Sequence, residues 1–210
     1  MYMNSTRNLP SPGNDRSDKE NLTMTSVSPV DMFLKLAPVP LQEFGPFFST
    51  FKKRAFRLET LPIYRVASED VAFQAFCRGA PNPDPRFNQP WHDILTAAKD
   101  AGKIFERVRL LSSALPSGLT AYEQFEMQWA YPDNRRAGEQ IHFGKAGIIE
   151  ELASELPCVM DYWLFDEAAG FLMFYDRRGQ FLGVARIPEE YIGAYRNGMH
   201  LALTSGQLVS

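Results

Sequence analysis

The chain has 210 residues, of which 45% are hydrophobic and 22% charged, the composition of a globular protein with ample material for a core. Its 22 Lys and Arg residues nearly balance 25 Asp and Glu residues, giving a net charge of -3. This balance argues against direct binding of nucleic acid or an anionic membrane. No apolar run reaches the roughly 18 residues of a membrane span, and the N-terminal stretch has no signal-peptide core, so we expect a cytoplasmic protein.

Residues 1–30 are rich in Ser, Asn, Asp and Pro and nearly free of large aliphatic side chains. Such a segment cannot bury enough surface to offset the entropy lost on ordering. We therefore expect a disordered tail over residues 1–30 and a single globular domain over residues 31–210.

The first part of that domain combines a helical and an extended pattern. Phenylalanines at helical spacing, followed by cations, predict an amphipathic helix over residues 41–55. Residues 56–66 are rich in β-formers around a proline, which predicts a short edge strand or extended segment.

Two bounded helices follow. Residues 68–79 have Ser68 as a candidate cap and Gly79 at the end. Residues 89–102 have a proline at the start and a glycine just past the last turn, with an apolar face between them. Both spans predict helices.

The middle of the chain predicts a strand and another helix. Residues 103–111 are β-rich. In residues 119–132, Thr120 and Glu123 have the spacing of a capping box, and an apolar stripe includes Tyr122.

The C-terminal third predicts three strands, over residues 158–166, 170–176 and 180–187, joined by tight turns. A helix over residues 188–203 follows, with one apolar stripe. The expected fold is therefore α+β, or α/β: one domain with a mixed, largely antiparallel sheet packed against helices.

Residue types that bind metals or act as nucleophiles are sparse. Cys77 and Cys158 lie far apart, and we interpret both as buried small side chains. The three histidines share no metal-ligand spacing, and no nucleophile elbow, Walker loop or dinucleotide fingerprint occurs. The sequence predicts neither a metal nor a cofactor.

The stretch NRRAGEQIHFGK, residues 134–145, crowds five ionisable side chains between glycines. The phospholipase D motif has one residue between its His and Lys, whereas two separate His142 from Lys145, which on a strand turns the lysine to the opposite face. That motif is therefore absent. The following GKAG is either an anion site at a helix N-terminus or an ordinary surface turn.

Several charged residues fall where the pattern predicts burial. Arg57 and Glu59 share one face of an extended segment, Arg107 and Arg109 share one face of the next, and Asp161 lies inside an apolar run. Buried charges must find partners.

Two interpretations of these charges stay open. In one, they form structural ion pairs together with Glu139. In the other, some of them converge with Tyr122 and Trp91 on a cleft that binds a small polar or anionic ligand. Glu139 is then a candidate general base, although no nucleophile or metal accompanies it.

Several blocks, in order over about residues 41–203, resemble the uncharacterised actinobacterial proteins of the domain of unknown function 6879: FRLETLPIY, GKIFERVRLL with LTAYEQFEMQWA, NRRAGEQI, and DYWLFD with MFYDRRGQFLG. The resemblance implies a bacterial cytoplasmic protein, often encoded beside helix-turn-helix transcriptional regulators. It also implies these signature positions: Arg57, Glu59, Arg107, Arg109, Tyr122, Gly138, Glu139, Asp161 and Trp163. The element order is similar to one phospholipase D-like half without its catalytic motif, an analogy of fold alone.

We expect a non-catalytic regulatory or sensory module that binds a small polar or anionic ligand, or a partner transcriptional regulator. The expected ligand-binding residues are Arg57, Glu59, Arg107, Arg109, Tyr122, Glu139, Asp161 and Trp163. The alternative is an enzyme acting on a phosphate-containing or aminoacyl substrate, with Glu139 as acid/base and the arginines stabilising the anion. DNA binding by the chain alone ranks third because no recognition-helix signature occurs.

Overall fold

A computed structural model describes residues 35–81, 85–144 and 147–209 of the chain. The predicted tail over residues 1–30 lies outside the described residues, as does Lys145.

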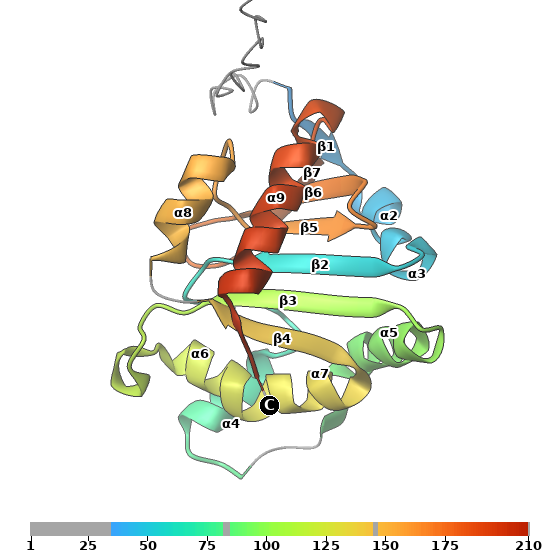
Figure 1. The fold of residues 1–210 in the computed structure, drawn as a ribbon. Helices are drawn as coiled ribbons and strands as arrows, with labels where there is room; N and C mark the ends of the chain where they lie inside the picture. Colours follow the sequence, from blue (N-terminus) through green and yellow to red (C-terminus); the bar gives the residue numbers. More distant parts are fainter. Residues whose placement is uncertain (1–34, 82–84, 145–146, 210) are drawn as a thin grey trace, which may run out of the picture.

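One mixed sheet forms the centre of the molecule, with its eight strands in the spatial order β1-β7-β6-β5-β2-β3-β4-β8 (Figure 1). The strands are β1 (Ala37–Val39), β2 (Arg54–Glu59), β3 (Ile104–Leu110), β4 (Glu139–Gly144), β5 (Tyr162–Phe165), β6 (Ala169–Tyr175), β7 (Phe181–Arg186) and β8 (Gln207–Leu208). β3 pairs in parallel with β2 and β4, and the other neighbours pair antiparallel. The predicted α+β fold with a mixed, largely antiparallel sheet is confirmed.

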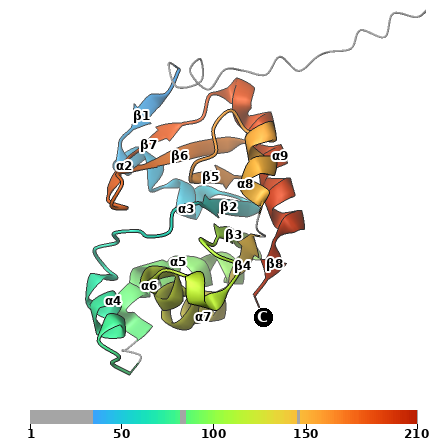
Figure 2. The same ribbon diagram turned by 90° about the vertical axis from the view of Figure 1, so that its left-hand side faces the viewer.

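Helices cover both faces of this sheet. They are α2 (Leu41–Phe44), α3 (Phe47–Thr50), α4 (Asp70–Cys77), α5 (Gln89–Asp100), α6 (Ala121–Phe125), α7 (Tyr131–Ala137), α8 (Ile148–Glu155) and α9 (Glu189–Ser205), with short 3-10 turns η1 (Pro85–Asn88) and η2 (Pro116–Gly118) and a π-helical segment η3 (Glu126–Ala130). Helices α8 and α9 lie on one side, and α2 to α7 lie on the other (Figure 2). In the described part of the chain, no helix has both the length and the apolar character needed to cross a bilayer.

The face under α8 and α9 is an almost purely apolar core. Phe56, Leu58 and Val108 point into it from the sheet, and Leu152 of α8 packs against them. The predicted stripe of α9 is confirmed, because all four of its members are buried there: Tyr191, Tyr195, Met199 and Ala202.

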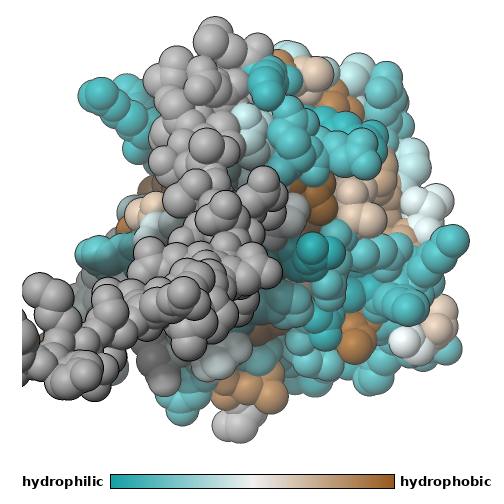
Figure 3. Space-filling model, turned by 45° about the horizontal axis from the view of Figure 1, so that its top comes forward, coloured by the Kyte–Doolittle hydropathy of each residue, from teal (hydrophilic) through white to brown (hydrophobic). Residues whose placement is uncertain are grey.

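The opposite face has two apolar clusters. In the first, α2, α3 and α5 pack on Phe105, Trp163 and Phe171 of the sheet. A second cluster joins α4 to α6 and η3 around Phe125 and Trp129. The surface in Figure 3 is mostly hydrophilic, with apolar residues in small patches.

The helix predicted over residues 41–55 is wrong in its extent. Pro46 lacks an amide hydrogen and separates two four-residue helices, α2 and α3, and the chain already enters β2 at Arg54. β2 is also a central strand, paired with both β3 and β5, rather than an edge strand. The proline that suggested an edge, Pro62, lies beyond the end of β2.

Four smaller comparisons with the sequence concern helix caps, the cysteines and one strand. The capping box of Thr120 and Glu123 is confirmed at the start of α6. Ser68 does not cap α4, whose first turn has no side-chain cap. Cys77 is exposed and Cys158 only partly buried, so the prediction that both are buried is wrong. Strand β4 within residues 134–145 was not predicted, because its glycines and charges hide the alternation of buried residues.

Candidate functional site

Five predicted residues project from three neighbouring strands onto the face covered by α4 to α7. In β2 and β3, alternate residues point to the same side, so Arg57 and Glu59 share a face, as do Arg107 and Arg109. The parallel register places Arg57 opposite Arg107 and Glu59 opposite Arg109. Glu139 joins them from β4. The sequence prediction that these pairs share a face is therefore confirmed, and like charges on neighbouring strands require carboxylates between them.

Glu59 supplies one such carboxylate. Its Oε1 lies 3.0 Å from Arg57 Nε and 2.5 Å from Arg107 Nη1, and its Oε2 accepts a hydrogen bond from Tyr131 at 3.1 Å. Burial alone would raise the pKa of Glu59, but Arg107, Arg57 and Arg109 outweigh it and lower that pKa to about 2. Glu59 is therefore ionised and fully engaged by the protein.

Arg107 continues the network to Glu139. Its Nε and Nη2 both lie 2.8 Å from Glu139 Oε1, while Asn134 donates to the other oxygen at 2.9 Å. His92 lies 3.0 Å from Asn134 Oδ1. Gly138, at φ 119°, allows the chain to turn from α7 straight into β4, which brings Asn134 and Glu139 together.

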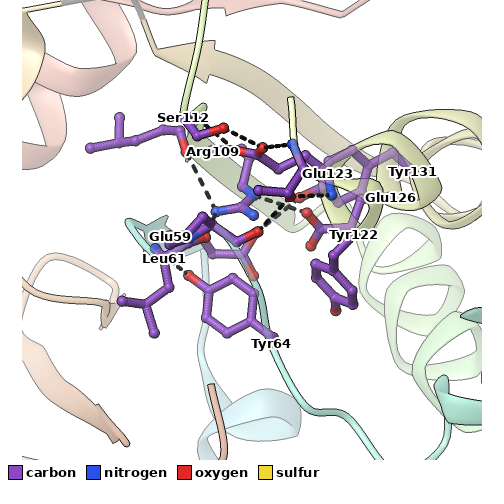
Figure 4. Close-up of polar contacts among 12 residues, drawn as sticks. Glu59, Leu61, Tyr64, Arg109, Ser112, Tyr122, Glu123, Glu126 and Tyr131 are labelled. Carbon is purple, nitrogen blue, oxygen red and sulfur yellow. Dashed lines mark hydrogen bonds and ion pairs between the residues drawn. The ribbon is translucent and has the colours of Figure 1, made fainter. Parts of the chain in front are cut away.

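Arg109 is fully buried at the other end of the network. It donates to the carbonyl of Leu61 and, through Nε, to Glu126 Oε2 at 3.0 Å, and its guanidinium lies over the ring of Tyr64 (Figure 4). Its Nη2 is buried without an acceptor among the described residues.

Glu126 opens the π-helical segment η3 between α6 and α7. The wider π turn is a local rearrangement often found at functional sites. Burial and the nearby carboxylates Glu59 and Glu69 outweigh the attraction of Arg109 and raise the pKa of Glu126 to about 8. This carboxyl group is therefore mostly protonated at neutral pH.

Asp161, immediately before β5, ties the loop after β2 to the sheet. Its Oδ1 accepts from the backbone and hydroxyl of Thr60, its Oδ2 accepts from Tyr64 at 2.6 Å, and Arg57 Nη2 lies 3.8 Å away. Burial raises the pKa of Asp161 above its ordinary value, against the effect of Arg57.

A cavity of about 360 Å³ lies between this network and the helices. Eighteen residues line it: Phe44, Phe48, Arg57, Glu59, Tyr64, Val66, Glu69, Asn88, Trp91, Ile94, Arg107, Tyr122, Glu126, Ala130, Tyr131, Asn134, Trp163 and Met173. Its volume is in the range of small-molecule pockets. Seven of the lining residues are aromatic, and seven carry a charged or amide side chain.

The predicted site residues divide into two layers. Arg57, Glu59, Arg107, Tyr122 and Trp163 line the cavity, as does Trp91. Arg109, Glu139 and Asp161 are not among the lining residues, and their contacts hold the lining residues and the surrounding loops in place.

Sequence reasoning missed several lining residues, notably Glu69, Glu126 and Tyr131. A signal existed for one of them: Glu126 lies four residues after Tyr122, on the buried stripe of the predicted helix. Glu69 accepts a hydrogen bond from Tyr122 at 2.7 Å, a contact between two helices that no local pattern encodes.

The lining is poor in groups for covalent or metal chemistry. Among the described residues it contains no Ser, Cys, Lys or His side chain. The described residues also bring no three His, Cys, Asp or Glu side chains together in a way that could hold a metal ion.

Comparison with solved structures finds neighbours of low similarity. The chain is similar to the crystal structure of phosphatidylserine synthase from Haemophilus influenzae Rd KW20, at 10% identity and a TM-score of 0.40. The match covers 80% of this chain and 36% of that chain, so the chain spans about a third of that protein's length. A likeness this low carries no argument about function. No curated protein matches the chain.

A family model gives the firmer result. The model described as domain of unknown function (DUF6879) matches residues 42–207, which include the whole charged network and every residue of the cavity lining. The chain belongs to the DUF6879 family.

Proposed function

We propose that this protein is a non-catalytic, cytoplasmic sensory module whose cavity binds a small polar molecule. The observation that carries the proposal is the cavity itself: about 360 Å³, lined by aromatic rings and bordered by a network of buried ion pairs. Such a combination of apolar walls and a few fixed polar groups is typical of small-molecule sites.

The paired network supports a binding role because it makes the cavity rigid before any ligand arrives. Arg107 uses three nitrogens on two carboxylates, and Glu59 receives two guanidinium groups and a phenol. A site built in this way loses little entropy on binding, which favours affinity.

The enzymatic alternative receives less support. It requires Glu139 as an acid or base, yet both Glu139 oxygens are engaged by Arg107 and Asn134 and the residue does not line the cavity. An anionic substrate is also disfavoured, because the guanidinium nitrogens of Arg107 already contact Glu59 and Glu139.

Thermal-shift screening with a library of nucleotides, amino acids, amines and organic acids tests the proposal. Val66 lines the cavity and is 38% exposed, so Val66→Trp should obstruct it without burying a new group in the core. Val71, on α4 and outside the lining, provides the matched control Val71→Trp. We expect a ligand that raises the Tm of the wild type and Val71→Trp but not of Val66→Trp. A library with no stabilising member would contradict the proposal.

The family resemblance suggests a helix-turn-helix regulator as the partner that reads the bound state. Co-expression of the chain with a helix-turn-helix regulator from the same genome, followed by size-exclusion chromatography, tests this partner. We expect a complex whose stability changes in Val66→Trp. Separate elution of both proteins under all ligand conditions would remove the partner from the proposal.

A further inference from the structure

The buried cluster around the cavity holds more carboxyl groups than guanidinium groups. Three guanidinium groups, from Arg57, Arg107 and Arg109, face five carboxyl groups: Glu59, Glu69, Glu126, Glu139 and Asp161. A buried carboxylate without a cationic partner is costly, so this surplus is relieved either by protonation or by a positive charge from outside.

The surplus is concentrated on two carboxyl groups that line the cavity. Glu69 accepts from Tyr122 through Oε2, and Glu126 accepts from Arg109 through Oε2. Within the described residues, neither Oε1 has a hydrogen-bond donor. Glu126 is only 4% exposed and lines the cavity, so a ligand in the cavity can reach the Oε1 that has no donor.

Most donors of the guanidinium groups that line the cavity are already engaged by other residues. All three guanidinium nitrogens of Arg107 contact Glu59 or Glu139. Arg57 donates through Nη2 to Tyr175, whereas its Nε lies 3.0 Å from Glu59 Oε1 without making a hydrogen bond. Among the described residues, Arg57 Nη1 has no acceptor either. Of the two lining guanidinium groups, only that of Arg57 therefore keeps free donors, and Glu59 and Asp161 already lie beside it.

The aromatic walls also suit a cation. Arg57 already lies over the rings of Tyr64 and Trp163, at 5.6 and 5.4 Å. Trp91 and Tyr122 line the same cavity, and no cation of the described residues lies over either ring. The negative faces of such rings attract ammonium groups.

From this geometry we infer that the cavity takes a small organic cation: an amine on a flat apolar body, with its ammonium group between Glu69 and Glu126. The inference rests on the proposed ligand-binding function and specifies its ligand class. Arg57 Nη1 is then available to a hydroxyl or carbonyl group of the same ligand.

Binding of a cation has a second consequence for Glu126. Because the free carboxyl group is mostly protonated at pH 7 and an ammonium beside it favours the carboxylate, its proton leaves for the solvent on binding. Amine binding therefore releases protons and tightens as the pH rises from about 6 to about 8, below the pKa of the amine.

Isothermal titration calorimetry with three probes of matched size tests the inference: phenethylamine, 2-phenylethanol and 3-phenylpropanoate. We expect the amine to bind at least about tenfold more tightly than the alcohol, with the acid weakest. Titration of the amine at pH 7 in two buffers of different ionisation enthalpy should give different heats, from the released proton.

Substitutions of the two glutamates test where the amine binds. Glu126→Gln and Glu69→Gln should each weaken the amine by about tenfold and leave the alcohol unchanged. Glu155→Gln, an exposed carboxylate on α8 at the opposite face, is the charge-matched control and should behave as the wild type. Glu69 is only half-buried, so its variant keeps the test valid if Glu126→Gln does not fold.

The outcomes separate the two proposals. If the acid or the alcohol binds as tightly as the amine, the inference of a cation fails and the ligand-binding function stands. If none of the probes binds and the metabolite library is also silent, the inference and the function fail together. Unchanged amine affinity in both variants would likewise overturn the inference.

Discussion

The two faces of the central sheet are stabilised by different physical means. Under α8 and α9 the sheet buries Phe56, Leu58, Val108 and their neighbours against an apolar helix stripe. Under α4 to α7 the same strands bury Arg57, Glu59 and Arg107 in a network of ion pairs.

This difference in packing indicates which face of the sheet has space for a ligand. Close packing leaves little space on the apolar face, whereas charged side chains fixed by one another leave a cavity with directional polar groups. An apolar side chain of the same volume would often stabilise a fold at least as well as a buried ion pair. The face under α8 and α9 also carries an ion pair, between Arg54 and the buried Glu106 at 3.0 Å, but the connected network borders the cavity. That position supports the proposed binding role of the network.

The largest effect is expected where the network loses a shared cation. Arg107→Met leaves Glu59 and Glu139 without their main partner, so the free energy of unfolding should fall by about 3–5 kcal/mol. Urea unfolding monitored by tryptophan fluorescence measures the change. Replacement of Lys35, whose ion pair with Glu190 is exposed, is the control and should be nearly neutral. A cost below about 1 kcal/mol for Arg107→Met would show that the pairs are easily replaced.

A comparable but simpler loss is expected on the apolar face. Leu152 of α8 is fully buried, and Leu152→Ala should lower the free energy of unfolding by about 3 kcal/mol through a cavity. Since no charge is involved, the cost should be the same at pH 5 and pH 8, unlike that of Arg107→Met. If the loss of unfolding free energy depended on pH equally in Leu152→Ala and Arg107→Met, the two faces would not differ in what stabilises them.

The third effect is a pH dependence from the charged face. Glu126 has a raised folded pKa, about 8, so the folded state binds more protons than the unfolded state between about pH 4.5 and 8. Its stabilising contribution is present below pH 4.5 and is lost as the pH rises towards 8. Stability should fall by on the order of 2 kcal/mol between pH 5 and 7.5.

Glu126→Gln should flatten that slope, as followed by chemical unfolding across the same pH range. Glu69 and Asp161, whose pKa values are also raised, keep part of it. Glu59 acts in the opposite sense: its pKa is lowered to about 2, so its contribution is present above about pH 4.5 and is lost in acid. An unaltered slope in Glu126→Gln would refute the assignment.

The smallest effect concerns a single hydrogen bond of the cavity wall. Tyr122→Phe removes the donor to Glu69 Oε2 and should cost about 1 kcal/mol. Thermal unfolding detects it, and Tyr191→Phe, on the apolar face, is the matched control. An unchanged Tm in Tyr122→Phe would show that the hydroxyl of Tyr122 contributes nothing to stability.

The sequence predicted the fold class because it depends on local periodicity. The stripe of α9 and the capping box at Thr120 are encoded within a few residues, and both are present. The extent of the first helix was mispredicted because the phenylalanine spacing continues across Pro46, where the backbone cannot continue the helix.

The candidate site was predictable in part for the same reason. Alternation in β2 and β3 reveals that Arg57 and Glu59 share one face of the sheet, as do Arg107 and Arg109. Which of them reaches the cavity depends on helices far away in the sequence: Glu126 from η3 covers Arg109, and Glu69 approaches from α4. The stripe of the predicted helix indicates that Glu126 is buried, but the spacing of nearby residues does not encode its contact with Arg109 or the contact between Glu69 and Tyr122.

The position of β2 between β3 and β5 has a consequence for synthesis on the ribosome. Thr60 and its partner Asp161 are 101 residues apart, so β2 emerges long before the strand that completes its other edge. Until then its open edge is a potential site of mispairing. Arg57 and Glu59 are hydrated at that stage, and charged residues in an unpaired strand disfavour its association with other strands. The charges that later border the cavity are therefore also expected to reduce aggregation of the nascent chain.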